Sequence, residues 1–199
     1  MAKITTTPPE SLCPTQITVG MIEVRDKQQQ LAALKSAEQE ELLRAHPLPA
    51  VLGPRGKLYI TDHHHLGRAA VEAGVGRVFC EIEVDFSAAH DPPGFWKEME
   101  ESSWVHPLDE NGVRHIYSRL PARLAQMVND VYRSLAAYVR NAGGYDKTGK
   151  AYAEFVWADF FRRNVAVEIV TGDFGAAVRA ALPLAKSHRA KSLPGFKGE

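Results

Sequence analysis

The hydrophobic period of the sequence changes abruptly at Asp62. Residues 57–61 read KLYIT, which is typical of a short β-strand, whereas the segment after Asp62 carries small and apolar side chains at helical spacing. Gly74 stands where a glycine commonly ends a helix, and residues 77–86 alternate apolar and polar side chains as a half-buried strand does. The chain is therefore predicted to form a strand, a helix and a strand around this junction.

The residues before the junction add further elements. Residues 16–24 contain several β-branched side chains and predict a strand, residues 28–45 are strong helix formers, and residues 49–53 predict another strand. Residues 16–86 are thus predicted to follow the order β–α–β–β–α–β. Residues 1–15 are rich in threonine and proline, and we expect them to form a flexible arm.

The second half of the chain has a different character, because helical patterns replace the strands. We therefore expect an α+β protein, with an α/β domain over residues 16–90 and a mainly helical region over residues 91–199 packed on it. The predicted helices of this region cover residues 93–104, 121–128, 131–142, 151–163 and 174–186.

Composition excludes several classes of protein. Lysine plus arginine and aspartate plus glutamate both number 24, so the chain lacks the basic excess expected of a protein that holds DNA mainly through its phosphates. Its two cysteines are too few for a disulfide framework or a cysteine-based zinc site. No apolar run approaches the length of a membrane span, and the first residues lack the apolar core of a secretory signal. We expect a cytoplasmic protein.

The junction itself carries the most unusual residues, the run Asp62-His63-His64-His65 followed by Arg68. The first N–H groups of a helix have no partner within the helix and lie at the positive end of its dipole, so they suit an anion such as phosphate. Imidazole and guanidinium groups add side-chain donors at the same place. Asp62 also fits an ordinary N-cap. A metal held by His64 or His65 with a distant glutamate is the weaker alternative, since adjacent histidines on a helix face different directions.

Glu23 is a second candidate. An acidic residue inside a β-branched strand is unusual, and at the end of such a strand its carboxylate would reach a cleft as a general base. The alternative is an exposed charge paired with Arg25 or Lys27.

Two stretches of the chain resemble the ParB-like nuclease domain, within the wider ParB/sulfiredoxin fold. TVGMIEV at residues 18–24 looks like the opening strand of that domain. LPAVLGPRGKLYITDHHHLGRAAVEAGVGRVFCEIEVD at residues 48–85 is similar to the family run that contains Asp-Gly-His-x-Arg. With NGVR, YRSLA, GGYDK and ALPLAK further along, the similarity extends over residues 15–199.

The resemblance implies roles for the residues of the junction, because the family holds nucleotide phosphates at this turn. Asp62 matches the family's aspartate, His64 its histidine, and His65 the position of its first arginine. Arg68 would supply the missing guanidinium one turn later. His63 stands where the family has a glycine, and its side chain would crowd a phosphate that glycine admits.

The resemblance also implies a role for Glu23. Amino-acid kinases of the same fold use a glutamate near the end of the first strand as a base, and Glu23 lies at a similar place. Lys27 would follow it as a phosphate ligand.

Two classes of function follow. The first is an enzyme acting on a phosphate ester or anhydride: a nuclease, a nucleotidase or a small-molecule kinase, with Glu23 and His64 as catalytic groups. It would take a nucleotide or a phosphorylated small molecule, with ATP, ADP or CTP and Mg²⁺ as cofactors and no resident metal site. The second is a non-catalytic, nucleotide-switched or DNA-binding module like those of partition proteins, which the basic residues near the C-terminus keep open. A third possibility is a domain that has lost its activity. A homo-oligomer is compatible with each of these three possibilities.

Overall fold

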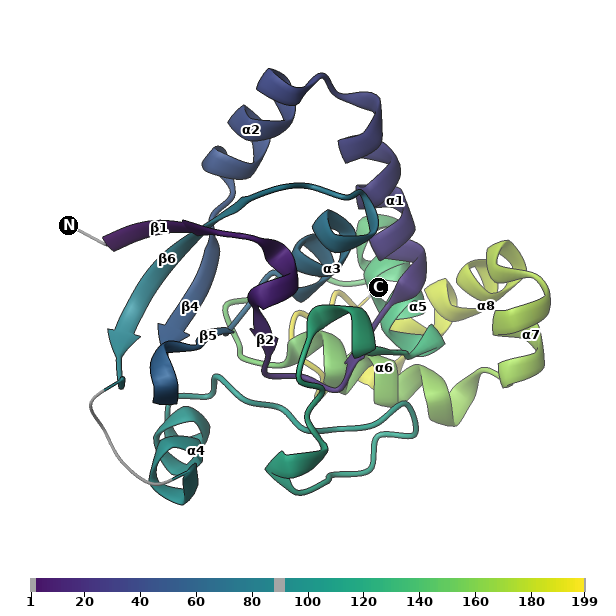
Figure 1. Ribbon diagram of the computed structural model, residues 1–199. Coiled ribbons are helices and arrows are strands. Elements are labelled where there is room, and N and C mark those ends of the chain that lie inside the picture. The colour runs from purple at the N-terminus through teal and green to yellow at the C-terminus, as the bar shows by residue number, and fades with distance from the viewer. Residues whose placement is uncertain (1–2, 88–91, 199) are drawn as a thin grey trace. The chain divides into compact units, whose positions relative to one another are not determined.

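The computed structural model, drawn in Figure 1, describes residues 3–87 and 92–198. These residues divide into two compact units. Each unit has its own elements and is described by itself. The first contains residues 3–19, 24–87, 92–109 and 113–128, and the second contains residues 20–23, 110–112 and 129–198.

The first unit is built on a mixed five-stranded sheet with the order β1-β6-β4-β5-β2. Strands β4 and β6 run parallel side by side in the sheet, and β1 pairs antiparallel with the other edge of β6 (Figure 1). Strand β5 is antiparallel to β4 and parallel to β2. The strands are β1 (Lys3–Thr7), β2 (Cys13–Pro14), β4 (Leu48–Leu52), β5 (Leu58–Ile60) and β6 (Val78–Asp85).

The expected flexible arm over residues 1–15 is wrong where the structure describes it. Residues 3–7 form β1, whose register pairs Lys3 with Ile82 and Thr7 with Val78. Isoleucine and threonines in this segment favour extended backbone, and the open edge of β6 supplies the hydrogen-bond partners. The prolines that suggested an arm lie after the strand, where Pro9 begins the short 3₁₀ helix η1 (Pro9–Ser11).

The predicted strand over residues 16–24 is also largely wrong. Thr18–Val19 form the short strand β3 and Gln16 makes an isolated β-bridge with His106, but the helix α1 (Met21–Ala33) begins directly after Gly20. The β-branched residues favour a strand locally, but an acidic residue in the first turn favours a helix N-terminus, and Glu23 takes that place. The helix expected over residues 28–45 is divided into α1 and α2 (Ser36–Ala45).

The junction is confirmed. Strand β5 leads into α3 (His64–Glu72), which leads into β6. Helix α3 packs closely on its surroundings at Gly67, where an added Cβ would lie 3.1 Å from Leu124 Cδ1. Next along the chain come α4 (Pro92–Glu101) and the 3₁₀ helices η3 (Tyr117–Arg119) and η4 (Leu124–Gln126). The helix expected over residues 121–128 is thus only the turn η4, which the short strand β7 (Val128–Asn129) follows.

The sequence predicts that residues 91–128 belong to the C-terminal region, but residues 92–109 and 113–128 cluster with the first unit. Buried side chains explain the grouping. Phe95 and Met99 of α4 pack with Val51 of β4 and with Val105 in one apolar cluster. Apolar contacts with a distant strand cannot be read from helical periodicity alone.

The second unit is helical, as expected. Helices α5, α6 and α8 correspond to predicted helices, and α7 was not predicted. Their core includes the fully buried Leu135, Trp157 and Phe161. The helices are α5 (Val131–Asn141), α6 (Ala153–Asn164), α7 (Val167–Gly172) and α8 (Phe174–Lys186), followed by the 3₁₀ helix η5 (His188–Ala190). Among the described residues, no helix is both long and apolar enough to cross a bilayer.

Candidate functional site

The turn from β5 into α3 depends on one residue with left-handed backbone. His63 has φ 58° and ψ 27° and is the N-cap residue of α3. The backbone N–H of His63 donates a hydrogen bond of 2.6 Å to Oδ1 of Asp62. The expectation that Asp62 is the N-cap is therefore wrong by one residue, because the left-handed turn places His63 at the boundary.

The conformation of His63 accounts for the glycine of the family pattern. Left-handed backbone costs a residue with a Cβ roughly 1–2 kcal/mol relative to the ordinary helical region, and glycine avoids that cost. His63 occupies the position with an exposed side chain, whose Nδ1 lies 3.1 Å from the carbonyl oxygen of Pro47. The departure from glycine thus changes the side chain but keeps the backbone turn.

His64 is placed differently from its neighbours. Its side chain is buried, with only 2% of the residue exposed, and its Nε2 accepts a hydrogen bond of 3.2 Å from the backbone N–H of Thr15. The hydroxyl of Thr15 donates in turn to the carbonyl of Ile60 at 2.8 Å. With Nε2 as acceptor, a neutral ring carries its proton on Nδ1. The contacts of His64 are those of a group that joins α3 to the strands.

Arg68 also makes internal contacts. Its Nη1 donates to the carbonyl oxygens of Leu124 and Met127, both at 3.0 Å, and its Nε donates to Glu72 at 2.7 Å. Only 12% of its side chain is exposed. The guanidinium predicted to complete a phosphate site therefore holds the segment around η4 to α3.

At the start of α3, His63 is exposed and His65 is partly exposed. The exposed carboxylate of Asp62 lies beside them in the chain. Within the described part of the chain, the side chain of His63 makes no capping hydrogen bond to the first turn of α3. This end of the helix can thus offer backbone N–H donors and imidazole groups to an anion.

Glu23 belongs to the second unit, where residues 20–23 are fixed on α5. The N–H of Met21 donates to Oδ1 of Asn129 at 3.0 Å, and the N–H of Ile22 donates to Oγ of Ser134 at 3.2 Å. Gly20 approaches so closely that an added Cβ would lie 2.6 Å from that Oγ. These contacts fix the first turn of α1, which contains Glu23.

The second unit also contains charged groups on α5 and α6 that the residue pattern did not single out. Arg133 is 4% exposed, its guanidinium carbon lies 3.6 Å from the centre of the Phe155 ring, and its Nη2 lies 3.8 Å from Glu154. Arg140 forms an ion pair with the same Glu154. Arg133 and Arg140 are seven residues apart on α5, a spacing that places both on one helix face and would have indicated the pair.

Glu23 and the two arginines act electrostatically on the same buried hydroxyl, that of Tyr145. Burial raises the pKa of Tyr145 well above its usual range, with Arg140 and Arg133 lowering that pKa and Glu23 raising it. The hydroxyl of Tyr145 donates to the carbonyl of Ala136 at 2.9 Å. We call Glu23, Arg133, Arg140 and Glu154 the α5 charged cluster.

Lys27 follows Glu23 by four residues on α1, so helical geometry places the two on one face of that helix. Its side chain is partly exposed. No group of three or more histidine, cysteine, aspartate or glutamate side chains among residues 3–87 and 92–198 is arranged to hold a metal ion.

The elements and the junction together define an α+β protein with a mixed sheet in one unit and helices in the other. The chain belongs to the ParB-like nuclease family, because the family model described as "Putative ParB-like nuclease" matches residues 6–163.

The chain also matches a solved structure over its full length. The chain is similar to the crystal structure of protein Atu1540 from Agrobacterium tumefaciens, with 33% identity and a TM-score of 0.93, over 100% of this chain and 98% of that one. A search of the curated proteins found no match.

Proposed function

We propose that this protein is an enzyme of a ParB/sulfiredoxin-like fold that acts on a phosphate ester or anhydride, and that it binds the phosphates of a nucleotide at the start of α3. The observation that carries the proposal is the left-handed turn at His63, with its exposed imidazole directly before the helix. Nuclease, nucleotidase and small-molecule kinase activity all fit this chemistry.

The phosphate would be held mainly by the backbone. Nitrogen atoms of the first helical turn, in His64, His65 and Leu66, lie at the positive end of the α3 dipole. The imidazoles of His63 and His65 would add donors from the side. Among the family residues, His64 and Arg68 would act by fixing the helix, since Thr15, Leu124 and Met127 already engage their polar atoms.

Glu23 is the proposed general base, which would take a proton from a water or a substrate hydroxyl. The guanidinium groups of Arg133 and Arg140 bring positive charge to the α5 charged cluster, where both lie near Glu154. Lys27, on the same helix face, would contact a phosphate oxygen.

ATP, ADP or CTP are the proposed ligands, with Mg²⁺ bound through their phosphates. Mg²⁺ usually keeps several waters and is held through substrate phosphates rather than a cage of protein ligands.

Thermal shift with ATP, ADP and CTP, with and without Mg²⁺, tests the binding step. At least one nucleotide should raise the melting temperature, as any ligand selective for the folded state does. His65→Ala should lower the affinity for that nucleotide by roughly tenfold, because it removes one charge-assisted donor. His46→Ala is the matched control, since His46 is exposed after α2, and should bind as the unaltered protein does. No stabilisation by any of the three nucleotides would contradict the proposal.

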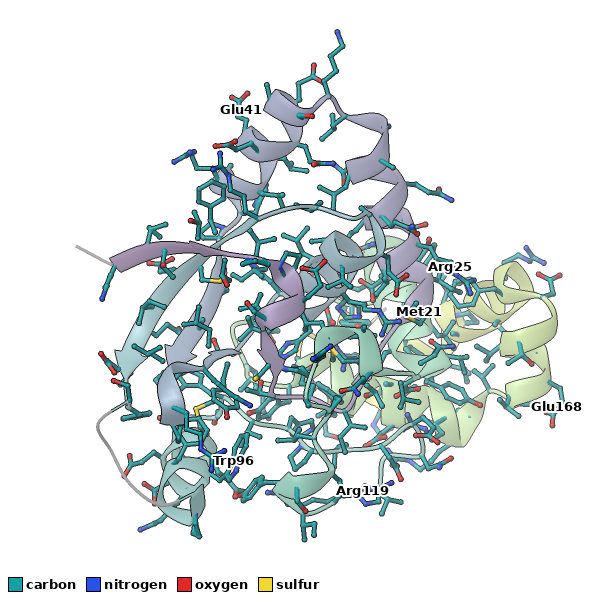
Figure 2. The ribbon with its side chains drawn as sticks, viewed as in Figure 1. Met21, Arg25, Glu41, Trp96, Arg119 and Glu168 are labelled. Atoms are coloured by element: carbon teal, nitrogen blue, oxygen red, sulfur yellow. The ribbon has the colours of Figure 1, made fainter. Side chains whose placement is uncertain are left out.

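Turnover is tested separately by phosphate release from the nucleotide that binds. Glu23→Gln should lower the rate by about 100-fold or more while keeping nucleotide affinity. Glu41→Gln, on the exposed surface of α2, is the control (Figure 2). Binding without any turnover in the unaltered protein would favour a non-catalytic, nucleotide-switched module.

A further inference from the structure

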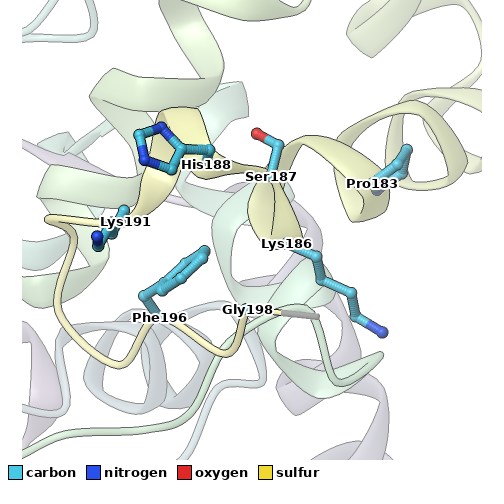
Figure 3. A pocket seen from close by; sticks show the side chains of 7 residues that line it. All are labelled: Pro183, Lys186, Ser187, His188, Lys191, Phe196 and Gly198. Carbon is cyan, nitrogen blue, oxygen red and sulfur yellow. The ribbon is translucent and has the colours of Figure 1, made fainter.

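The second unit contains a pocket that lies apart from the α5 charged cluster in sequence and shares no residue with it. It has a volume of about 410 Å³ and is lined by residues at the end of α8, in η5 and in the C-terminal segment (Figure 3). Pockets that hold small ligands commonly measure a few hundred Å³ or more. The pocket is therefore large enough to hold a single nucleotide.

The charged side chains that line this pocket are basic. Lys186, His188 and Lys191 line it, and no acidic side chain does so among the described residues. No carboxylate of the described residues lies within ion-pair distance of the amino groups of Lys186 and Lys191. This local basic charge stands out in a chain whose formal net charge is zero, and it favours an anion.

An aromatic ring completes the lining. Phe196 lies between Lys191 and Lys186 in Figure 3 and is partly exposed. The C-terminal segment that carries it is held in place, because Trp157 Nε1 donates to the carbonyl of Pro194 at 2.7 Å and the N–H of Asp146 donates to the carbonyl of Gly195 at 2.8 Å. A planar base can stack on such a fixed ring.

We infer that this pocket binds a phosphate group carried by a planar base, as in a nucleotide, and that it is a second anion site independent of the one at α3. Lys186, His188 and Lys191 contact the phosphate, and the ring of Phe196 stacks on the base. The hydroxyl of Ser187 donates to the carbonyl of Leu184 at 2.7 Å, so it contributes an acceptor only.

Amide NMR of the full chain with AMP as the probe tests the inference. AMP should shift the amide signals of residues 186–198. Lys186→Ala combined with Lys191→Ala should lower the affinity for AMP by about tenfold or more. Lys147→Ala combined with Lys150→Ala is the matched control, since it removes two exposed lysines of the same unit outside the pocket. Unchanged signals at saturating AMP, or equal affinity in both double variants, would overturn the inference.

Further variants and ligands distinguish the binding of the base from that of the phosphate, and the pocket from the site at α3. Phe196→Leu should lower the affinity for AMP but leave the affinity for inorganic phosphate unchanged. An equal loss of affinity for both ligands would show that Phe196 does not stack on the base. His63→Gly and His65→Ala should leave the signals of the pocket unaffected, because those residues belong to α3 and its N-cap. Shifts only at α3 would overturn this inference and leave the proposed function intact. A short thymidine oligonucleotide that binds more tightly than AMP identifies single-stranded nucleic acid as the source of the phosphate, and weaker binding identifies the free nucleotide.

Discussion

The Nε2 atom of His64 accepts a hydrogen bond from the backbone N–H of Thr15, 49 residues earlier in the chain, inside the first unit. Thr15 directly follows β2, and its hydroxyl donates to Ile60 at the end of β5. The pair therefore fixes the first residue of α3 to the strands on which the candidate phosphate site depends.

His64→Ala should destabilise the protein strongly. It removes a buried ring and leaves the N–H of Thr15 without its acceptor, which together cost about 2–4 kcal/mol in the free energy of unfolding. Urea denaturation measures this loss. His65→Ala, at a partly exposed position, should change the same free energy by less than about 1 kcal/mol. Equal effects of the two variants would contradict the structural role of His64.

His63→Gly should stabilise the protein, because glycine adopts left-handed backbone without the penalty paid by a Cβ. The expected gain is about 0.5–1 kcal/mol after the extra entropy of glycine in the unfolded chain is subtracted. Arg55→Gly is a comparison at a second left-handed residue, with φ 62°. A loss of stability in His63→Gly would show that the imidazole contact with Pro47 outweighs the backbone strain.

Arg68→Ala should cost about 2–3 kcal/mol, since three hydrogen bonds of a mostly buried guanidinium are lost together. Glu72→Gln, which alters only the ion pair to a side chain 37% exposed, should cost less than about 1 kcal/mol. Chemical denaturation of both variants compares them. If Arg68→Ala kept full stability but lost nucleotide affinity, Arg68 would be a phosphate ligand after all.

Gly20→Ala should disturb the position of Glu23. Its new Cβ would lie 2.6 Å from Ser134 Oγ and 2.7 Å from the backbone nitrogen of Ser134, so the first turn of α1 would have to shift. We expect a lower melting temperature and a turnover rate at least about tenfold lower, because small displacements of a catalytic group are costly. Gly149→Ala, where an added Cβ meets nothing within 4 Å, should behave as the unaltered protein.

Stability should fall with rising pH partly through Cys80. Burial raises the pKa of this thiol from 9.0 to about 11 in the folded state. A raised pKa means that the folded state holds its proton longer than the unfolded state, so the contribution is complete below pH 9 and is lost as the pH rises through 11. The loss amounts to about 2–3 kcal/mol. Cys80→Ala should show a shallower decline in unfolding free energy between these pH values, and an identical decline would contradict the assignment.

The sequence was sufficient for elements set by local periodicity. The change of period at Asp62 predicted β5, α3 and β6, and apolar spacing predicted most helices of the second unit. Features that depend on distant partners were missed. Strand β1 pairs with the edge of β6, and the buried His64 accepts a hydrogen bond from Thr15, although neither partner is near in sequence.

The candidate site divides in the same way. Residue types indicated an anion site at the start of α3, but the direction of each side chain depends on tertiary contacts. Arg68 was assigned to phosphate because the carbonyl groups of Leu124 and Met127 could not be placed beside it from the sequence. The α5 charged cluster likewise requires the packing of α5 against α6.

Amide NMR during a titration with ATP and Mg²⁺ tests the central claim most directly, because it reports on the N–H groups proposed to hold the phosphates. The signals of His64, His65 and Leu66 should show the largest shifts in the first unit, saturating with the same affinity as the thermal stabilisation. Saturable ATP binding that leaves these three amides unchanged would contradict the account.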